Sequence, residues 1–157
     1  MSIYALKPAF QNLLRPLVRQ LHAAGVTANQ VTSIATLASV GVGALLWWLA
    51  AGDRRLLLLL PLWMFLRMAF NAIDGMLARE FGQKSRLGAM LNELGDVVSD
   101  AALYAPFALL APFHPAWVAA VIVLATISEF AGALGPSIDD ERRYDGPMGK
   151  SDRAAVF

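Results

Sequence analysis

The stretch from Val31 to Ala51, VTSIATLASVGVGALLWWLAA, decides the fold class, because it carries no charged side chain. A helix needs about 20 such residues to cross the hydrocarbon core of a bilayer. Three more apolar stretches follow, at 56–72 with a continuation past Asp74, at 88–111 and at 116–134. Only helices and closed barrels pair all their backbone groups inside lipid, and no alternating pattern supports a barrel. The sequence therefore predicts an all-α, polytopic transmembrane helix bundle with four visible spans.

Composition agrees with a membrane location. The chain has 157 residues, of which 57% are hydrophobic and 16% charged, with a mean hydropathy of +0.53. Soluble domains average roughly 45–50% apolar and about 25% charged residues. A net charge of +1 gives no indication of nucleic-acid binding, and the lack of cysteines excludes thiolate metal sites. The length predicts one membrane domain covering 1–157.

The N-terminal segment 1–24 differs from the rest, since apolar residues at helical spacing alternate with Lys7, Arg15 and Arg19. A basic amphipathic segment is typical of a helix lying on the membrane surface. An amphipathic helix packed on protein is the alternative. Pro8 and Pro16 are expected to divide the segment into two pieces.

Basic residues predict the orientation of the bundle. Cytoplasmic loops are enriched in Lys and Arg. Arg54 and Arg55 are the basic residues of one side, whereas ten lie on the other. The N-terminus, the loop between the second and third spans, and the site described below are therefore expected to face the cytoplasm. The ten residues are Lys7, Arg15, Arg19, Arg79, Lys84, Arg86, Arg142, Arg143, Lys150 and Arg153.

The C-terminal region reads as a polar loop at 139–153 followed by an apolar start at 154–157. We expect further spans that this sequence does not include. A naturally short tail is the alternative.

The chemistry concentrates in two segments, Asn71-Ala-Ile-Asp74-Gly-Met-Leu-Ala-Arg79 and Gly88-Ala-Met-Leu-Asn-Glu-Leu-Gly-Asp-Val-Val-Ser-Asp100. Helical spacing places Asn71 and Asp74 on one face. It places the second set of polar residues on one face too: Asn92, Asp96 and Asp100. Carboxylates at membrane depth normally face the bundle interior, paired or bound to a cation. Two such helices side by side would offer oxygen ligands to Mg²⁺.

Small residues accompany these oxygen ligands. Gly75, Ala78 and Gly88 leave room for a ligand to approach the backbone. Arg79 can bind a phosphate through two parallel hydrogen bonds. This combination is typical of a diphosphate site at a water–lipid boundary. Elsewhere, Gly41 and Gly43 are expected to let helices approach closely.

These residues resemble the signature of the CDP-alcohol phosphotransferase family, Asp-x-x-Asp-Gly-x-x-Ala-Arg followed by Gly-x-x-x-Asp-x-x-x-Asp. The matching positions are Asp74, Gly75, Ala78, Arg79, Gly88 and Asp96. Thr27-Ala-Asn-Gln-Val-Thr32 resembles the family's entry to its first span, and Gly149-Lys150 resembles a basic element ahead of its fifth. The chain is similar to a bacterial branch with asparagines in the motif. Asn71 and Asn92 occupy the first and third acidic positions, so the number of bound metals stays open.

The resemblance implies a six-span fold and an activity in phospholipid biosynthesis. The substituted phosphate of a CDP-alcohol, with CDP-diacylglycerol as the expected donor, would pass to an unidentified hydroxyl acceptor with release of CMP. The implied cofactor is Mg²⁺ or Mn²⁺, and the implied location is the bacterial inner membrane. Whether the protein forms a homodimer stays open. Asp96 would be the catalytic base. The implied metal ligands are Asn71, Asp74, Asn92 and Asp96, and the implied substrate-binding residues are Asn29, Thr32, Gly75, Ala78, Arg79, Gly88, Asp100 and Lys150.

Other functions remain open. The string Asn92, Asp96 and Asp100 also fits membrane prenyltransferases, although their second acidic motif is not visible. Intramembrane carboxylates would suit a cation transporter, and the asparagines would suit a non-catalytic relative with a binding or structural role. Arg67 lies inside the second span. It is expected to pair with Asp100 or Glu129, and substrate binding is the alternative.

Overall fold

The computed structural model describes residues 6–139, and within this range every regular element is helical. Five α-helices are joined by short loops and two 3₁₀ segments, which confirms the all-α prediction. The elements are α1 (Leu6–Ala23), α2 (Ala28–Leu49), η2 (Arg54–Leu58), α3 (Leu59–Glu80), α4 (Arg86–Tyr104), η3 (Ala105–Leu109) and α5 (Pro115–Asp139).

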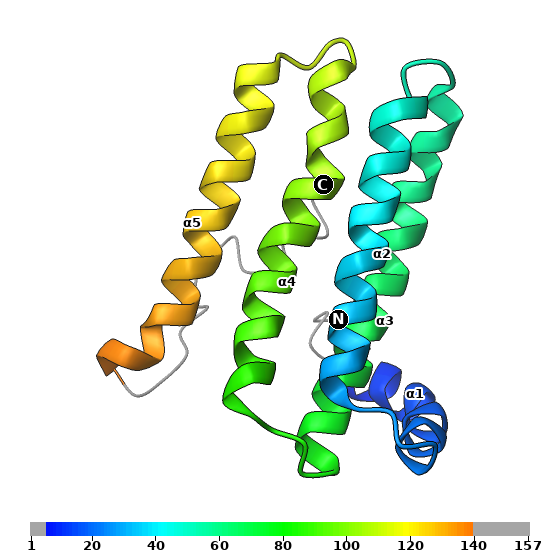
Figure 1. Ribbon diagram of the computed structural model, residues 1–157, viewed down its shortest axis with the longest axis vertical. Coiled ribbons are helices and arrows are strands. Elements are labelled where there is room, and N and C mark those ends of the chain that lie inside the picture. The colour runs from blue at the N-terminus through cyan, green and yellow to red at the C-terminus, as the bar shows by residue number, and fades with distance from the viewer. Residues whose placement is uncertain (1–5, 140–157) are drawn as a thin grey trace.

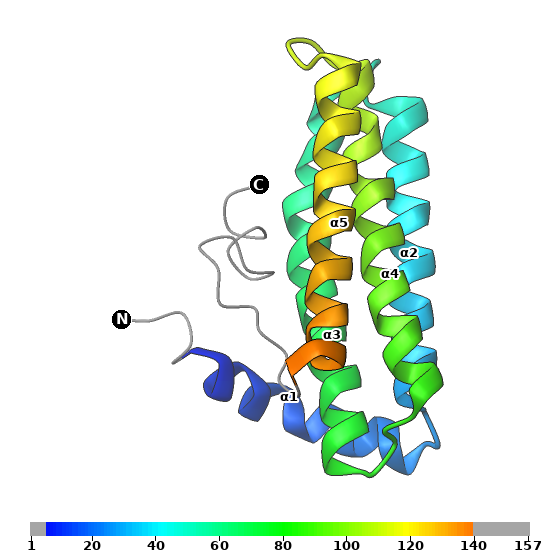
Figure 2. The same cartoon turned by 90° about the vertical axis from the view of Figure 1, so that its left-hand side faces the viewer.

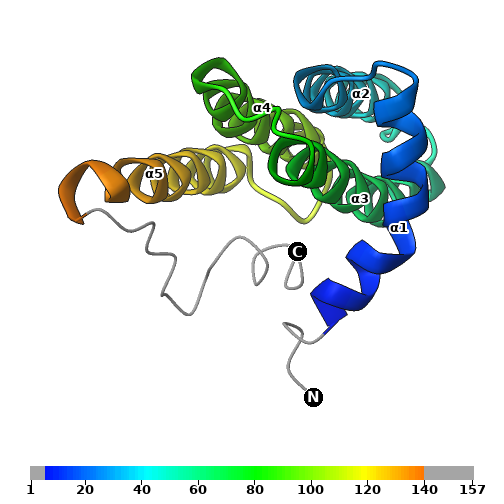
Figure 3. The same ribbon diagram turned by 90° about the horizontal axis from the view of Figure 1, so that it is seen from below.

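Four of these helices run side by side as a bundle, and α1 crosses one end of it (Figures 1 and 2). Helix α2 packs against both α3 and α4, and α5 packs against α4. Figure 3 shows α5 at the edge of the bundle, with α4 between it and the other helices. The loop from α3 to α4 lies at the same end as α1, whereas η2 and the turn into α5 lie at the opposite end.

Three segments of the described chain are long and apolar enough to cross a membrane, namely Ala28–Leu49, Arg54–Glu80 and Pro115–Leu134. They correspond to the first, second and fourth predicted spans. The third predicted span, 88–111, forms α4 and then the 3₁₀ segment η3. Helix α4 does not meet the same composition criterion because Glu93, Asp96 and Asp100 make it too polar. Its 19 residues still extend about 28 Å alongside the spans.

Helix α1 has two different faces. Val18 is fully buried in an apolar cluster with residues of α2 and α3, whereas Leu13 is exposed. Arg15 forms an exposed ion pair with Glu80 at the end of α3, with 2.9 Å between the charged atoms. One face of this amphipathic helix thus packs on protein, and the other remains available to a membrane surface.

The expected break in α1 is wrong, because the helix continues through Pro16. Pro8 stands in the first turn, where a missing backbone N–H costs no helical hydrogen bond. Burial of Val18 against the bundle offsets the single bond that Pro16 removes.

Local signals fix where the helices of the bundle begin. Thr27 and Gln30 form a capping box at the start of α2, and the Ser85 hydroxyl accepts the N–H of Gly88 at the start of α4. The Gln83 side chain accepts the backbone N–H of Ala28 at 2.7 Å. The loop between α3 and α4 is therefore tied to the first turn of α2.

The far end of the bundle is held by apolar packing. Its core cluster contains Leu46, Ala50, Leu60, Leu103 and Leu110. Burial of such side chains stabilises the contact between helices by close packing. The polar residues of the predicted site lie elsewhere on α3 and α4, closer to α1.

Candidate active site between α2, α3 and α4

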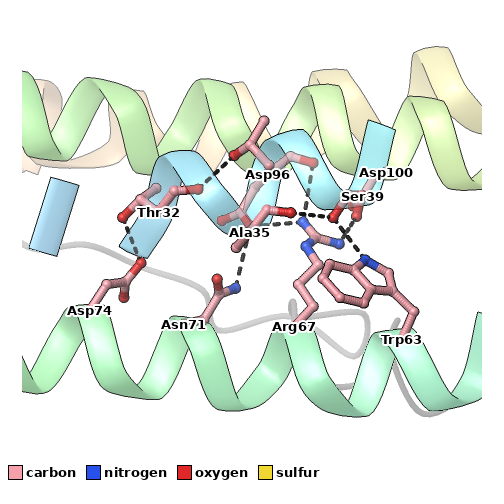
Figure 4. Close-up of polar contacts among 10 residues, drawn as sticks. Thr32, Ala35, Ser39, Trp63, Arg67, Asn71, Asp74, Asp96 and Asp100 are labelled. Carbon is pink, nitrogen blue, oxygen red and sulfur yellow. Dashed lines mark hydrogen bonds and ion pairs between the residues drawn. The ribbon is translucent and has the colours of Figure 1, made fainter. Parts of the chain in front are cut away.

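Asp74 is buried on α3 and faces α2 (Figure 4). Its Oδ2 accepts a hydrogen bond from the Thr32 hydroxyl at 2.7 Å. Thr32 Oγ1 also lies 3.1 Å from the carbonyl oxygen of Ala28, one turn earlier on α2. Thr32, one of the predicted substrate-binding residues, thus holds the carboxylate of Asp74 in position.

Asp96 is buried on α4 and faces α3. Its Oδ1 accepts hydrogen bonds from Arg67 at 2.8 Å and from the amide of Asn71 at 3.4 Å. Arg67 Nη2 also lies 3.2 Å from the backbone oxygen of Asp96. The predicted base and one predicted metal ligand therefore meet through side chains that reach between α3 and α4, as Figure 4 shows.

Arg67 joins the two carboxylates of α4. Besides Asp96, it forms an ion pair with Asp100 through Nη1. The expected pairing with Asp100 is confirmed, whereas the sequence interpretation missed the pairing with Asp96. A signal existed, because Arg67 precedes Asn71 by four residues and helical spacing places both on one face.

The remaining predicted residues of α4 extend the same polar region. Asn92 is half-buried one turn before Asp96, and so is its neighbour Glu93, which is not one of the predicted site residues. Asp100 is half-buried one turn after it. Helical spacing thus brings the predicted oxygen ligands of α4 to one side, as expected.

The predicted phosphate-binding residues lie at the end of α3. A Cβ atom added to Gly75 would lie 2.9 Å from Arg79 Nη2, so the guanidinium rests against the bare backbone of this glycine. Arg79 itself is exposed. Ala78 instead packs beside the apolar cluster that contains Val18 and Leu77.

Asn29 and Gly88 come together from different helices. A Cβ atom at Gly88 would lie 2.6 Å from Asn29 Oδ1, so this side chain rests close to the bare backbone of the glycine at the start of α4. Asn29 also lines an open, mainly apolar pocket of about 380 Å³ with Val26, Gln30, Ser33 and Ile34. Lys150, the last predicted substrate-binding residue, lies outside the described residues.

The donor set fits a hard divalent cation in chemistry, since it consists of carboxylate and amide oxygens. The donor set carries few charged ligands. Among residues 6–139, no three His, Cys, Asp or Glu side chains lie close enough together to hold a metal ion. Two predicted ligands, Asn71 and Asn92, are neutral amides, and Asp96 already bonds to a guanidinium. The residues therefore suit a metal that shares its ligands with a substrate, as Mg²⁺ commonly does with phosphate.

Asp74 on α3 and Asp96 on α4 are buried carboxylates, and Arg79, predicted to bind phosphate, lies near the end of α3. Together they define a polytopic membrane protein with an intramembrane polar centre. The CDP-alcohol phosphatidyltransferase family matches residues 25–137, and the chain belongs to that family. This match includes every predicted site residue except Lys150.

Curated relatives fall into two groups. The chain is 48% identical over 157 residues to the inner membrane protein YnbA of Escherichia coli K12, covering all of this chain and 77% of that protein. It is 34% identical over 128 residues to the phosphatidylinositol phosphate synthase of Mycobacterium tuberculosis H37Rv, covering 76% of this chain and 55% of that enzyme. The archaetidylinositol phosphate synthase of Aeropyrum pernix is 35% identical over 127 residues, covering 80% of this chain and 63% of that enzyme. No solved structure matches the chain.

The chain thus spans only about half to two thirds of the length of these synthases.

Proposed function

We propose that this protein transfers a phosphatidyl-type group from a CDP-alcohol, with CDP-diacylglycerol as the donor, to a hydroxyl acceptor, releasing CMP in phospholipid biosynthesis. The observation that carries the proposal is the pair of buried carboxylates, Asp74 on α3 and Asp96 on α4, within one polar region. Membership of the family and the names of the synthase relatives support it.

In the proposed reaction, the acceptor oxygen forms a bond to the donor phosphorus that carries the lipid, and the bond from that phosphorus to CMP breaks. The hydroxyl proton passes to Asp96, which must lie within hydrogen-bond reach of it. Arg79, at the open end of α3, stabilises negative charge on the diphosphate. Asn29 and Thr32 lie on the side of α2 from which the nucleotide would enter.

A divalent cation, Mg²⁺ or Mn²⁺, would polarise the diphosphate as a Lewis acid when bound. Asp74 and Asp96 would hold it, with the amide oxygens of Asn71 and Asn92 as neutral ligands. Thr32 fixes the orientation of Asp74, and Arg67 fixes that of Asp96. Such hydrogen bonds to ligands help to set their geometry.

The relatives suggest where the search for an acceptor begins. The phosphatidylinositol phosphate synthase and the archaetidylinositol phosphate synthase are both named for inositol phosphate products. A phosphorylated polyol is therefore the first acceptor to test, followed by unphosphorylated polyols.

A non-catalytic family member is the second candidate. The observation in its favour is that Asp96 is already bonded by Arg67 and Asn71, so the carboxylate is satisfied by the protein itself. Such a protein would bind a CDP-alcohol without releasing CMP.

Release of CMP separates the two candidates. Purified protein in lipid is incubated with CDP-diacylglycerol, Mg²⁺ and a panel of hydroxyl acceptors, beside Asp96→Asn and Asp74→Asn. Asp53→Asn is the matched control, because Asp53 is exposed and caps η2, where asparagine also caps well. Acceptor-dependent CMP release that Asp53→Asn retains and Asp96→Asn loses supports the transferase. A wild type that binds CDP yet is silent with every acceptor, beside an active Asn71→Asp, Asn92→Asp variant, would overturn it.

We further propose that the protein resides in the bacterial inner membrane with the site facing the cytoplasm. These 157 residues contain no cysteine, so a single cysteine introduced among them can be labelled without background from the others. An impermeant thiol reagent applied to intact cells should modify Arg54→Cys and spare Lys84→Cys. The reverse pattern would place the site on the wrong side of the membrane. A homodimer stays a prediction.

A further inference from the structure

The starting observation is the location of Arg67, a cation inside the membrane-spanning helix α3. The residue is buried, with 8% of its surface exposed. Its guanidinium reaches across to α4 and pairs with both Asp96 and Asp100. A planar guanidinium presents several donors in a fixed fork, so one arginine can hold two carboxylates where lysine could not do so with the same geometry.

Asn71 completes this arrangement. An ionised carboxylate can only accept hydrogen bonds, so the contact with Asp96 requires the NH₂ group of Asn71. An aspartate at position 71 would instead place a second negative charge against Asp96, and like charges at such a distance repel. Arg67 thus neutralises the charge of Asp96, and both Arg67 and Asn71 donate hydrogen bonds to its Oδ1.

The charges of the region have a simple balance. Asp74, Asp96 and Asp100 carry three negative charges and Arg67 carries one positive charge, so two negative charges remain, which one divalent cation would offset. Glu93 on α4 and Arg79 near the end of α3 carry opposite charges, so together they add no net charge to this count. A second divalent cation would add two positive charges to this group of four residues, whose net negative charge the first cation already offsets.

We infer that Arg67 is a fixed internal cation of this centre: it holds Asp96 and Asp100 in place of a second metal ion, so that the site takes one divalent cation. The inference rests on the proposed function for the presence of a metal at all. Arg67 is then a positioning residue that acts through Asp96. Its charge also weakens attraction for the metal, because two positive charges near one carboxylate repel.

The first measurement is the number of Mn²⁺ ions bound per chain, counted by electron paramagnetic resonance with the lipid-embedded protein in the presence of CDP. We expect one Mn²⁺ per wild-type chain. Two ions per wild-type chain, or none, would overturn the inference, and neither result depends on how a variant folds.

The second measurement isolates the charge of Arg67. Removing Arg67 alone would leave the buried Asp96 and the half-buried Asp100 without their partner, which is strongly destabilising. We therefore compare Asp100→Asn with the double variant Arg67→Met, Asp100→Asn, since the two differ only in the arginine. The double variant should bind Mn²⁺ about tenfold more tightly. Arg67→Lys keeps the charge but loses the fork that reaches both carboxylates, so its Mn²⁺ affinity should lie closer to that of the wild type than to that of the double variant.

A purely structural role predicts a different result. The melting temperatures would fall in the Arg67 variants while the Mn²⁺ affinities of the two Asp100→Asn proteins stayed equal, and equal affinities would overturn the inference. Measuring CMP release on the same samples separates this inference from the proposed function. Two Mn²⁺ ions with active turnover would reject only the inference, whereas one Mn²⁺ ion without turnover would reject only the transferase.

Discussion

The same three helices, α2, α3 and α4, are joined in two contrasting ways along their length. At the end near η2 they meet through an apolar cluster that includes Leu46, Leu60 and Leu103. Nearer α1 they meet through Thr32, Arg67 and the carboxylates of Asp74 and Asp96. Apolar side chains tolerate any neighbour of suitable shape, whereas each buried charge needs a particular partner. The first region therefore holds the bundle together, and the second is available for chemistry.

The largest effect should come from the polar region. Replacing Asp96 with asparagine removes the proposed proton acceptor and a negative charge, so CMP release should fall about 10²- to 10⁴-fold. Because asparagine keeps the size of the side chain, the melting temperature should change far less than the rate. Activity that survives unchanged in Asp96→Asn would show that the carboxylate only ties Arg67 to α4. That result would make both regions structural and remove the contrast between them.

The apolar region should respond in the opposite sense. Leu103 has 1% of its surface exposed, so Leu103→Ala should cost about 2–5 kcal/mol of stability. Turnover per folded molecule should stay near the wild-type value below the melting temperature, because Leu103 does not belong to the proposed site. The measurement is a thermal melt paired with CMP release. Exposed Leu109→Ala, with 48% of its surface accessible, is the control and should shift the melt much less.

These two regions also differ in how far the sequence predicts them. Length and hydropathy predict four spans, of which three are long and apolar enough in the described chain to cross a membrane. Capping signals at Thr27 and Ser85 agree with where two helices begin. The site residues on each helix follow from spacing by three and four. The partner of Asp96 does not follow, because contact between helices depends on their axial rotation and relative shift. The sequence interpretation therefore named Asp100 and Glu129 as partners for Arg67 but could not choose between them or identify Asp96.

The contact between α2 and α4 offers a test of intermediate size. A Cβ atom at Gly43 would overlap the backbone oxygen of Ala102. A Cβ atom at Gly41 would have no heavy atom of a neighbouring element within 4 Å. Gly43→Ala should therefore push α2 from α4 and cost about 1–3 kcal/mol. Gly41→Ala is the matched control and should be neutral or slightly stabilising, since alanine favours a helix.

Thermal melts of the two glycine variants in the same lipid decide the matter. Equal melting temperatures would contradict the close approach at Gly43. The expectation that both glycines serve helix contact is confirmed for Gly43, and the structure places Gly41 on an exposed face of α2.

The smallest effect concerns Asn71 and Asn92, whose amides lower the charge of the polar region. Restoring aspartate at both adds two negative charges around the proposed metal position. We expect Asn71→Asp with Asn92→Asp to raise the apparent Mg²⁺ affinity about tenfold, because nearby carboxylates favour a bound cation. Turnover need not improve, since tighter metal binding can slow the release of CMP. Mg²⁺ titration of CDP binding measures the affinity, and each single variant apportions it.

The two single variants should not be equivalent. Asn71→Asp also removes the amide that donates to Asp96, so without metal it places two carboxylates in direct repulsion. Its melting temperature should therefore drop without Mg²⁺ and recover with Mg²⁺, as ligand binding stabilises the folded state. Asn92 lies on the same helix as Asp96, one turn away, so Asn92→Asp should show a weaker version of this dependence. If Mg²⁺ stabilises both variants and the wild type to the same extent, the asparagines do not set the charge of a metal site.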